Sequence, residues 1–369
     1  MPALPKPLPR IDLLDYGRFA AAIAVMAYHL FCLLIAAGKA PNITLVDSVS
    51  AVASHGYLGV ELFFMISGYV IFFSAQGRTP AQFAVSRMLR LYPAFLFCML
   101  ATAAVKLAFP VEAGALYPSQ FLTNLTMMPR LFGRNEIDGS YWTLTLELCF
   151  YAMVMVMLVL RQSKNLEKMF ICWPVVILVA GPLGSTSMPV LGGYYSYFAA
   201  GALFAIRKTN RSHWVSLALL ICFYDSMRAY NGNKSPAEVS ALINITAITC
   251  FYFFIYPLHH PHIANLRLPG AKFVGSLTYP VYLIHQVIGT VIIAKFATEA
   301  NKVGVIFLVM VGMLAVAGGI HYLVEVRMKE WWRSSINRLV GVPVARMDIA
   351  AQSTRKLLMS WWRVKADQA

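Results

Sequence analysis

Long uninterrupted apolar runs follow one another along most of the 369-residue chain. A helix of about 20 apolar residues crosses the hydrocarbon core of a bilayer, which is roughly 30 Å thick. The runs are continuous rather than alternating, which indicates helices and not the strands of a membrane barrel. We therefore predict an all-α, polytopic membrane helix bundle with about ten transmembrane helices. Their expected ranges are 11–37, 56–74, 89–109, 142–160, 169–184, 190–206, 214–228, 239–256, 277–298 and 303–325.

The composition agrees with this pattern. Hydrophobic residues make up 59% of the chain, charged residues make up 13%, and the mean hydropathy is +0.63. A soluble globular domain has roughly 45–50% apolar and about 25% charged residues. A disordered chain is poor in apolar and aromatic residues. Both of these classes are therefore excluded.

The Lys and Arg residues are divided unevenly between the two sides of the predicted bundle. With ten spans both chain ends lie on one side, and most of the 31 Lys and Arg residues lie there too. The loops on the other side carry Lys39, Arg130, Arg134, Arg228, Lys234 and Lys302. The positive-inside rule then places both termini in the cytoplasm. Because this bias accounts for much of the net charge of +15, we expect no nucleic-acid partner.

The chain divides into a membrane domain over 1–326 and a basic cytoplasmic tail over 327–369. The tail combines Lys and Arg with Trp331, Trp332, Trp361 and Trp362. Such a mixture favours an interfacial segment that lies on anionic membrane lipid.

The six cysteines all fall within apolar runs, and none belongs to a Cys-x-x-Cys pair. Structural zinc sites and disulfide frameworks use other spacings. We therefore expect neither a disulfide nor a metal site.

Ionisable residues inside a membrane span are costly and indicate function. Arg18 and His29 both lie in the first span. Since successive helical residues advance by about 100°, the two side chains share one helix face, roughly 16 Å apart along the axis. A neutral imidazole can take a proton from a hydroxyl, and a guanidinium group suits a ligand that carries phosphate. The alternative is a packing histidine with an arginine that extends to the cytoplasmic surface.

The second span and the segment after it contain another polar cluster. Glu61 is a carboxylate in an otherwise apolar run, and Arg87 and Arg90 follow at a spacing that places them on one helix face. A pair of guanidinium groups is a candidate phosphate site. The same arginines also fit ordinary positive-inside charge.

Two further clusters lie in later spans. Glu147 is about one turn inside the outer start of the fourth span, close to Trp142. Together they could hold a sugar ring, although Trp is also a common interface anchor. In the ninth span Tyr279, Tyr282 and His285 form a polar, aromatic stripe near the cytoplasmic end. That stripe suits the entry of a cofactor arm, or it serves only helix packing.

These clusters, taken in order, resemble the motifs of the acyltransferase 3 family of multispanning membrane acyltransferases. The family pattern of Arg, ten residues and His corresponds to Arg18 and His29. Its Gly-x-x-Gly-Val-x-x-Phe-Phe-x-x-Ser-Gly block is matched by Gly56, Gly59, Val60, Phe63, Phe64, Ser67 and Gly68. Its Phe-x-x-x-Arg-x-x-Arg-x-x-Pro block is matched by Phe83, Arg87, Arg90 and Pro93.

Later blocks match with small departures, so that the resemblance covers about 11–326. The Trp-Ser-Leu-x-x-Glu block is matched by Trp142, Leu144 and Glu147, with Thr143 in place of Ser. The Ser-x-Tyr-x-x-Tyr-Leu-x-His block is matched by Tyr279, Tyr282, Leu283 and His285, with Ser276 offset by one residue. The final Glu-Pro pair is incomplete, because Val326 follows Glu325.

The resemblance implies transfer of an acyl group, usually acetyl, from cytoplasmic acyl-CoA to a hydroxyl. The acceptor would be a carbohydrate, either a cell-surface polysaccharide or its lipid-linked sugar precursor, and the location would be the bacterial inner membrane. The residues expected to bind the acyl-CoA are Arg18, Arg87, Arg90, Tyr279, Tyr282 and His285.

In the mechanism that we expect, His29 acts as the general base, and Arg18 and Glu147 complete the catalytic set. The acceptor arrives from the outer side, where Trp142, Glu147 and Glu61 hold it. The cationic groups would then lie inward and the carboxylates outward, with His29 between them. An acyl-enzyme formed on His29 is a variant of this route.

A secondary transporter is the competing interpretation. Intramembrane His, Arg and Glu residues also suit a proton relay. Transporters often contain internal repeats with paired broken helices, and the two halves of this sequence show no such match.

Overall fold

The computed structural model describes residues 10–110, 114–180, 190–231 and 238–353. Within these ranges the regular structure is helical, and none of the described residues forms a strand. The described residues include seven helical stretches that are long and apolar enough to cross a membrane, namely Asp12–Ala36, Asp47–Ala75, Pro80–Ala108, Gly139–Val159, Leu242–His259, Ala271–Phe296 and Lys302–Arg327. The all-α membrane bundle is therefore confirmed.

The helices of the first half follow the predicted runs closely. α1 (Asp12–Ala27), the π-helical η1 (Tyr28–Leu33) and α2 (Leu34–Ala36) form one continuous helix. The next elements are α3 (Asp47–Ala53), the 3-10 turn η2 (Gly56–Leu58), α4 (Gly59–Ala75) and α5 (Pro80–Ala108). They are followed by α7 (Pro118–Asn124), the 3-10 turns η3 (Pro129–Phe132) and η4 (Gly139–Tyr141), and α8 (Trp142–Val159).

The second half begins with three helices that fall short of those seven in length or apolarity. After η5 (Ser163–Asn165) they are α9 (Leu166–Ala180), α10 (Tyr195–Ile206) and α11 (His213–Asn231). The chain continues with α12 (Glu238–Ile255), η8 (Tyr256–His259), α13 (Pro261–Ala264) and α14 (Ala271–Phe296). The last elements are α15 (Lys302–Ile320), η9 (His321–Arg327), α16 (Lys329–Ile336) and η10 (Asn337–Gly341).

The start of α5 differs from the prediction, because the helix begins at Pro80 rather than near residue 89. Thr79 and Gln82 form a capping box, each side chain bonding the backbone N–H of the other residue. Pro at the first helical position is also favourable there. The helix therefore extends beyond its apolar run and presents Arg87 and Arg90 on regular helical turns.

The order of contacts defines two ends of the bundle. α14 begins beside the start of α1, since Gly275 lies against Asp15, and α1 and α14 run in the same direction until Gly289 meets Leu30. α4 runs antiparallel to α1, with Gly59 packed on the backbone of Ala21. We call the end at which α1 and α14 begin and α4 stops the basic end, because most of the Lys and Arg residues lie there.

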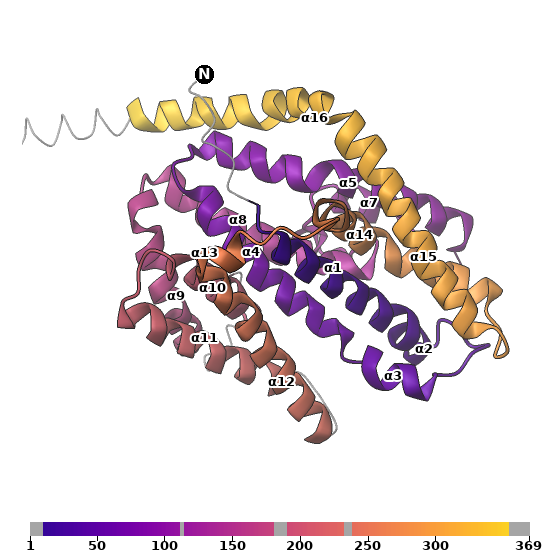
Figure 1. The fold of residues 1–369 in the computed structure, drawn as a ribbon. Coiled ribbons are helices and arrows are strands. Elements are labelled where there is room, and N and C mark those ends of the chain that lie inside the picture. Colours follow the sequence, from indigo (N-terminus) through magenta and orange to yellow (C-terminus); the bar gives the residue numbers. More distant parts are fainter. Residues whose placement is uncertain (1–9, 111–113, 181–189, 232–237, 354–369) are drawn as a thin grey trace, which may run out of the picture.

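α16 lies across the basic end. It follows α15 after a change of direction, and the yellow helical segment then crosses the top of the bundle in Figure 1. An ion pair of 2.9 Å between Arg161 and Asp348 ties this segment to the chain that follows α8. Trp331 is exposed on this segment. Trp361 and Trp362 of the predicted tail lie outside the described residues, as do residues 181–184 of a predicted span.

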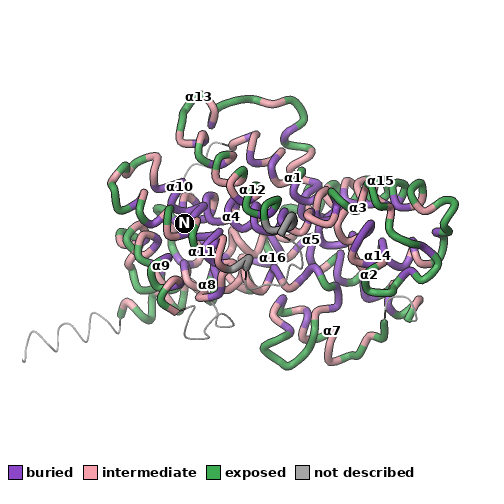
Figure 2. The backbone as a smooth tube through the Cα atoms, turned by 90° about the horizontal axis from the view of Figure 1, so that it is seen from below, coloured by how far each residue is buried: buried purple, intermediate pink, exposed green. Residues whose placement is uncertain are grey.

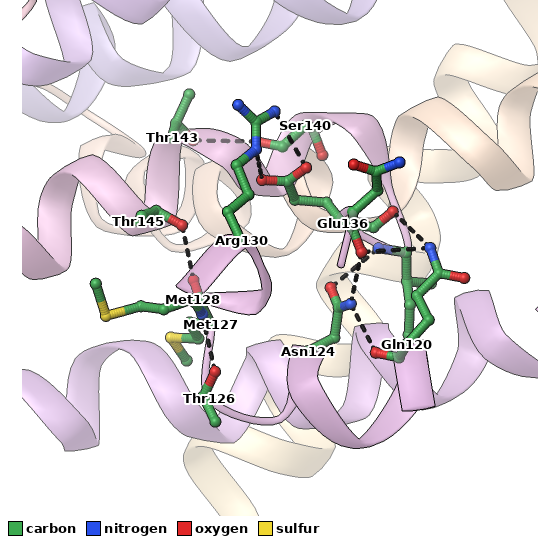
Figure 3. A network of polar contacts seen from close by, with 12 residues as sticks. Gln120, Asn124, Thr126, Met127, Met128, Arg130, Glu136, Ser140, Thr143 and Thr145 are labelled. Carbon is green, nitrogen blue, oxygen red and sulfur yellow. Dashed lines mark hydrogen bonds and ion pairs between the residues drawn. The ribbon is translucent and has the colours of Figure 1, made fainter. Parts of the chain in front are cut away.

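The segment between α5 and α8 folds into a compact cap at the opposite end. Asn124 donates to the carbonyl groups of Gln120 and Asn135 and accepts from the backbone N–H of Ile137. Figure 3 shows this network, with Arg130 paired to Glu136 close by. The cap fixes the path of the chain as it enters α8.

Buried residues concentrate at the centre of the bundle, whereas α13 and α7 extend to its periphery (Figure 2). α10 is buried along its whole length. It packs on α4 through glycines, because a Cβ at Gly201 would collide with the carbonyl oxygen of Met65 and one at Gly68 with that of Phe198. Small residues allow this close approach of two membrane helices.

Candidate active site

A cavity of about 420 Å³ lies between α1, α4, α5, α8 and α14. We call it the arginine cavity. Its polar lining comprises Arg18, Ser67, Ser86, Arg87, Arg90, Thr143, Glu147, Tyr151, Thr278, Tyr279 and Tyr282. Five helices that are distant in sequence therefore bring together six of the residues that sequence reasoning selected.

Three guanidinium groups face this cavity. The Arg90 guanidinium lies 5.4 Å from the ring centre of Tyr279, and that of Arg87 lies 5.8 Å from the ring centre of Tyr151. Arg18 approaches Asp15 at 3.8 Å. Neither Arg87 nor Arg90 forms an ion pair with any carboxylate among the described residues. Their charge is therefore available to an anionic ligand.

Arg78 adds positive charge at the basic end, in the link between α4 and α5. Burial lowers the pKa of Arg78 below its ordinary value, and repulsion from Arg87 acts in the same direction. The two groups are thus close enough to repel each other. An anion bound near them would relieve that repulsion.

Glu147 lies in the arginine cavity rather than apart from it. Its carboxylate accepts hydrogen bonds from the hydroxyl of Ser67, at 3.0 Å, and from that of Tyr151. The expected separation, with cationic groups inward and Glu147 outward, is not the arrangement found. The cause is packing, because α8 and α4 bring Glu147 onto Ser67 at the depth of the arginines.

His29 and His285 contact each other directly. Their Nδ1 and Nε2 atoms are 2.7 Å apart, and their ring centres are 4.9 Å apart. His29 is the second residue of the π-helical η1, and π-helical turns occur often at functional sites. His285 is in the middle of α14, so it lies deeper than the cytoplasmic end expected from the sequence.

The protonation pattern of this pair follows from its neighbours. The Nδ1 of His285 is 2.8 Å from the carbonyl oxygen of Tyr282 and 3.1 Å from that of Val281. A carbonyl oxygen can only accept, so Nδ1 of His285 carries the hydrogen. In the neutral ring its Nε2 then accepts from Nδ1 of His29. The remaining nitrogen of His29, Nε2, is thereby left with a free lone pair.

A buried turn before α8 holds this part of α14. The carboxylate of Asp138 accepts from the backbone N–H of Val287 at 3.0 Å, and from both the N–H and the hydroxyl of Ser140. The hydroxyl of Tyr141 donates to the carbonyl of Leu283. Asp138 is fully buried. Sequence reasoning placed it in an outer loop and gave it no role, since nothing in the local pattern reveals its contact with α14.

Two tyrosines of α14 connect the arginine cavity with the histidine pair. The Tyr282 hydroxyl lies 2.9 Å from that of Thr143 and donates to the carbonyl of Ser140. Its ring centre is 5.7 Å from that of His285. Tyr279 donates to the carbonyl of Leu91, which fixes the ring beneath Arg90. Both tyrosines line the cavity.

Trp142 and Glu61 do not line the arginine cavity. The Trp142 ring packs against those of Phe64 and Tyr194, at 6.5 Å and 5.1 Å between ring centres. Glu61 is buried in α4, and its Oε2 atom has no hydrogen-bond partner in the part of the chain that the structure describes. Sequence reasoning also missed Tyr151, whose only local signal is its spacing of one helical turn after Glu147.

The arrangement thus combines a cavity lined by three guanidinium groups with a histidine whose free nitrogen suits proton abstraction. No curated protein and no solved structure matches the chain. A family model described as an acyltransferase domain matches residues 11–322, which is most of the sequence. The matched segment contains the arginine cavity and the histidine pair. Together with the apolar helices, this match identifies the chain as an integral membrane acyltransferase that belongs to the acyltransferase 3 family.

Proposed function

We propose that the protein transfers an acyl group, acetyl in the first instance, from cytoplasmic acyl-CoA to a hydroxyl of a cell-surface polysaccharide or its lipid-linked precursor. The observation that supports this proposal is that Tyr282, which lines the cavity together with three arginines, also contacts His285 of the histidine pair. The basic end would face the cytoplasm of a bacterial inner membrane, since the positive-inside rule favours that orientation.

The arginine cavity would bind the donor. The phosphate groups of CoA suit Arg87 and Arg90, because guanidinium groups bind phosphate through charge-assisted hydrogen bonds. Arg18 would hold the donor from α1. Tyr279 and Tyr282 line the same cavity, Tyr279 beside Arg90 and Tyr282 beside His285, and would contact the pantetheine arm. Glu147 would position the guanidinium groups while Ser67 and Tyr151 hold its carboxylate.

His29 would act as the general base. Its Nε2 takes the proton from the acceptor hydroxyl while that oxygen attacks the carbonyl carbon of the thioester. The C–S bond then breaks, and the imidazolium returns the proton to the leaving thiolate, which gives an ester and free CoA. A general base of this kind contributes about 10²–10⁴-fold to the rate.

The first test measures donor binding on purified protein in detergent. A ligand that binds only the folded state stabilises it by about 2.7 kcal/mol at a hundredfold excess over its Kd. We expect acetyl-CoA to raise the Tm of the wild type and of His29→Ala but not of Arg87→Ala. Arg346→Ala is the matched control, since this exposed arginine lies outside the cavity. An unchanged Tm of the wild type at millimolar acetyl-CoA would contradict the donor assignment.

The second test measures release of the free CoA thiol in the presence of acceptor. We expect His29→Ala to lower this rate by about 10²–10⁴-fold without loss of the acetyl-CoA-dependent rise in Tm. Wild-type rates in His29→Ala would exclude its role as base. A labelled acyl-protein that chases into product would replace direct transfer by an acyl-enzyme route. Acceptor movement without any CoA release would favour the transporter.

His285 would be a positioning residue that acts through His29. His285→Ala is expected to lower kcat by about 10–100-fold, the usual range for a group that orients a functional imidazole, and to leave the KM for acetyl-CoA unchanged. His285→Gln should recover part of this loss, because its side-chain carbonyl can accept from Nδ1 of His29. Equal losses in both variants would show that His285 only fills space.

A further inference from the structure

A second cavity of about 420 Å³ lies between η1 and α3, at the opposite end of the bundle from the arginines. We call it the α3 groove. Its lining residues are Tyr28, Cys32, Leu33, Ala36, Leu45, Asp47, Ser50, Ala51 and Ser54. None of these residues belongs to the motifs that sequence analysis selected.

The α3 groove adjoins His29 through Tyr28, whereas the arginine cavity adjoins the histidine pair through Tyr282. Tyr28 lines the groove, and its ring centre is 5.3 Å from that of His29. Arg18 lines the arginine cavity on the same continuous helix. An α-helix rises about 1.5 Å per residue, so Arg18 and Tyr28 are roughly 15 Å apart along the axis. The two cavities therefore approach the histidine pair from opposite ends.

The polar groups of the groove suit a neutral polyol. Asp47 is exposed, and its carboxylate has no hydrogen-bond or ion-pair partner among the described residues. The hydroxyls of Ser50 and Ser54 donate to backbone carbonyls of α3. Nδ1 of His55 also lies 3.2 Å from the Ser54 hydroxyl, and each hydroxyl oxygen still keeps a lone pair that can accept from a ligand. The hydroxyls of a sugar can donate hydrogen bonds to carboxylate and hydroxyl oxygens.

The remaining walls fit the apolar parts of a sugar and of an attached lipid. Tyr28, held edge-on by Tyr57 at 5.6 Å, presents an aromatic ring that can pack on C–H groups. Leu33 and Leu45 supply aliphatic surface. No Lys or Arg is present among the described lining residues, and Asp47 would repel a phosphate. The α3 groove is therefore negatively charged where the arginine cavity is positively charged, and the two cavities should bind ligands of different charge.

We propose that the α3 groove binds the acceptor as a neutral saccharide, with its reactive hydroxyl directed past Tyr28 toward Nε2 of His29. This assignment rests on the proposed acyl transfer. It moves the acceptor from Trp142, Glu147 and Glu61 to η1 and α3. The groove is open on the side of Asp47, Ala51 and Leu45, so a glycan chain or lipid anchor can extend away from it.

The binding test uses cysteine accessibility in nanodiscs, without acyl-CoA. Ser54→Cys places a thiol in the groove, and Ser48→Cys places one on the exposed side of the same helix. Labelling by maleimide is read at each position by peptide mass, which separates it from the native thiols. The probes are octyl β-D-glucoside, octyl β-D-galactoside and octyl α-D-mannoside below micelle formation, with octanol as the chain-only control.

We expect at least one glycoside to slow labelling of Ser54→Cys by about fivefold or more and to leave Ser48→Cys unchanged. Octanol should protect neither position. Absence of protection by all three glycosides would overturn the proposal. Equal protection by octanol would also overturn it, because the groove would then bind only the alkyl chain.

The transfer test separates this proposal from the donor assignment. After Ser54→Cys is blocked with maleimide, acetyl-CoA should still raise the Tm, whereas glycoside-dependent CoA release should fall at least tenfold. Blocked Ser48→Cys should retain its rate. Full transfer by blocked Ser54→Cys would exclude the groove as the acceptor site. Loss of the acetyl-CoA effect on unmodified protein would instead count against the donor site, which the protection experiment does not use.

Discussion

The two faces of α4 differ more than its largely apolar sequence suggests. One face packs on α10 so closely that Gly68 and Gly201 each touch the backbone of the partner helix. The other face lines the arginine cavity through Phe63, Ser67 and Ile71. Ser67 and Gly68 are neighbours in sequence, but they lie on different faces. Ser67 donates a hydrogen bond to a carboxylate in a polar cavity, whereas Gly68 packs tightly against a backbone carbonyl oxygen of α10.

The comparison shows how a polar cavity can keep its shape within a membrane bundle. Lipid supplies no hydrophobic drive for helix association, so membrane helices depend on close van der Waals packing. Contact of backbone with backbone leaves α4 no freedom to shift toward or away from α10. The hydroxyl of Ser67 is therefore presented to Glu147 from a fixed position.

A substitution at the contact between α4 and α10 should give the largest effect, because it disturbs the folding of the whole protein. Gly201→Val directs a branched side chain into the carbonyl of Met65, where backbone atoms cannot move aside. Overpacking costs about 1–3 kcal/mol even where side chains can adjust, so we expect little folded protein after extraction. Gel filtration and Tm provide the measurement.

Gly312→Val is the matched control, because a Cβ at Gly312 of α15 would meet no atom within 4 Å. It should leave yield and Tm unchanged. A similar loss in both variants would indicate a general intolerance of valine, and the difference between the two faces would lose its basis.

A substitution on the face of α4 that lines the arginine cavity should give an intermediate effect, which is confined to ligand binding. Ser67→Ala removes one of two hydrogen bonds to Glu147, and a net hydrogen bond is worth about 0.5–1.5 kcal/mol. The freed carboxylate can then turn toward an arginine, so we expect the Kd for acetyl-CoA to rise roughly two- to tenfold. Isothermal titration of the purified protein would measure this change.

The control on the same helix is Ser74→Ala, which removes a hydroxyl that donates to the carbonyl of Ile71, away from Glu147. Its Kd for acetyl-CoA should equal that of the wild type, and both variants should keep their Tm. An unchanged Kd in Ser67→Ala would show that the bond to Glu147 does not shape the donor site.

The smallest effect is expected from Thr143→Ser, at the position where the chain departs from the family pattern of serine. Thr143→Ser retains the hydroxyl that bonds Tyr282, so CoA release should stay within about twofold of wild type. Thr143→Val keeps the shape but loses the bond, and it leaves a buried hydroxyl of Tyr282 with one partner fewer, at a cost of about 1–3 kcal/mol. Equal rates in both variants would remove any role for this hydroxyl.

The elements that the sequence predicts well are those governed by the membrane alone. The first span was expected over 11–37 and is helical from Asp12 to Ala36, because the bilayer sets both of its limits. The start of α5 was predicted too late, since the capping box of Thr79 continues the helix into water. Such a cap leaves no trace in a hydrophobicity pattern.

The candidate site could be predicted as a set of residues but not as a geometry. The face shared by Arg18 and His29 follows from helical periodicity alone. The contact of His29 with His285 joins residues on different helices, and the burial of Asp138 depends on the fold of the cap. These features arise from packing between distant segments, which spacing along one helix does not encode. Glu147 shows the same limit, since its position in the span was predicted but its place among the arginines was not.

The π-helical η1 has a consequence for chain length. A π-turn holds an additional residue relative to an α-helical turn, and each residue rotates an α-helix by about 100°. Because the additional residue is contained within one wider turn, a single-residue deletion between Leu30 and Leu33 that restores regular α-helix leaves the wall of the α3 groove on the same side relative to the helix face that carries Arg18. A regular α-helix with the same number of residues would instead turn that wall by about 100°. The wider turn therefore keeps the two cavities in phase, and relatives aligned with a gap at this point should keep both cavities.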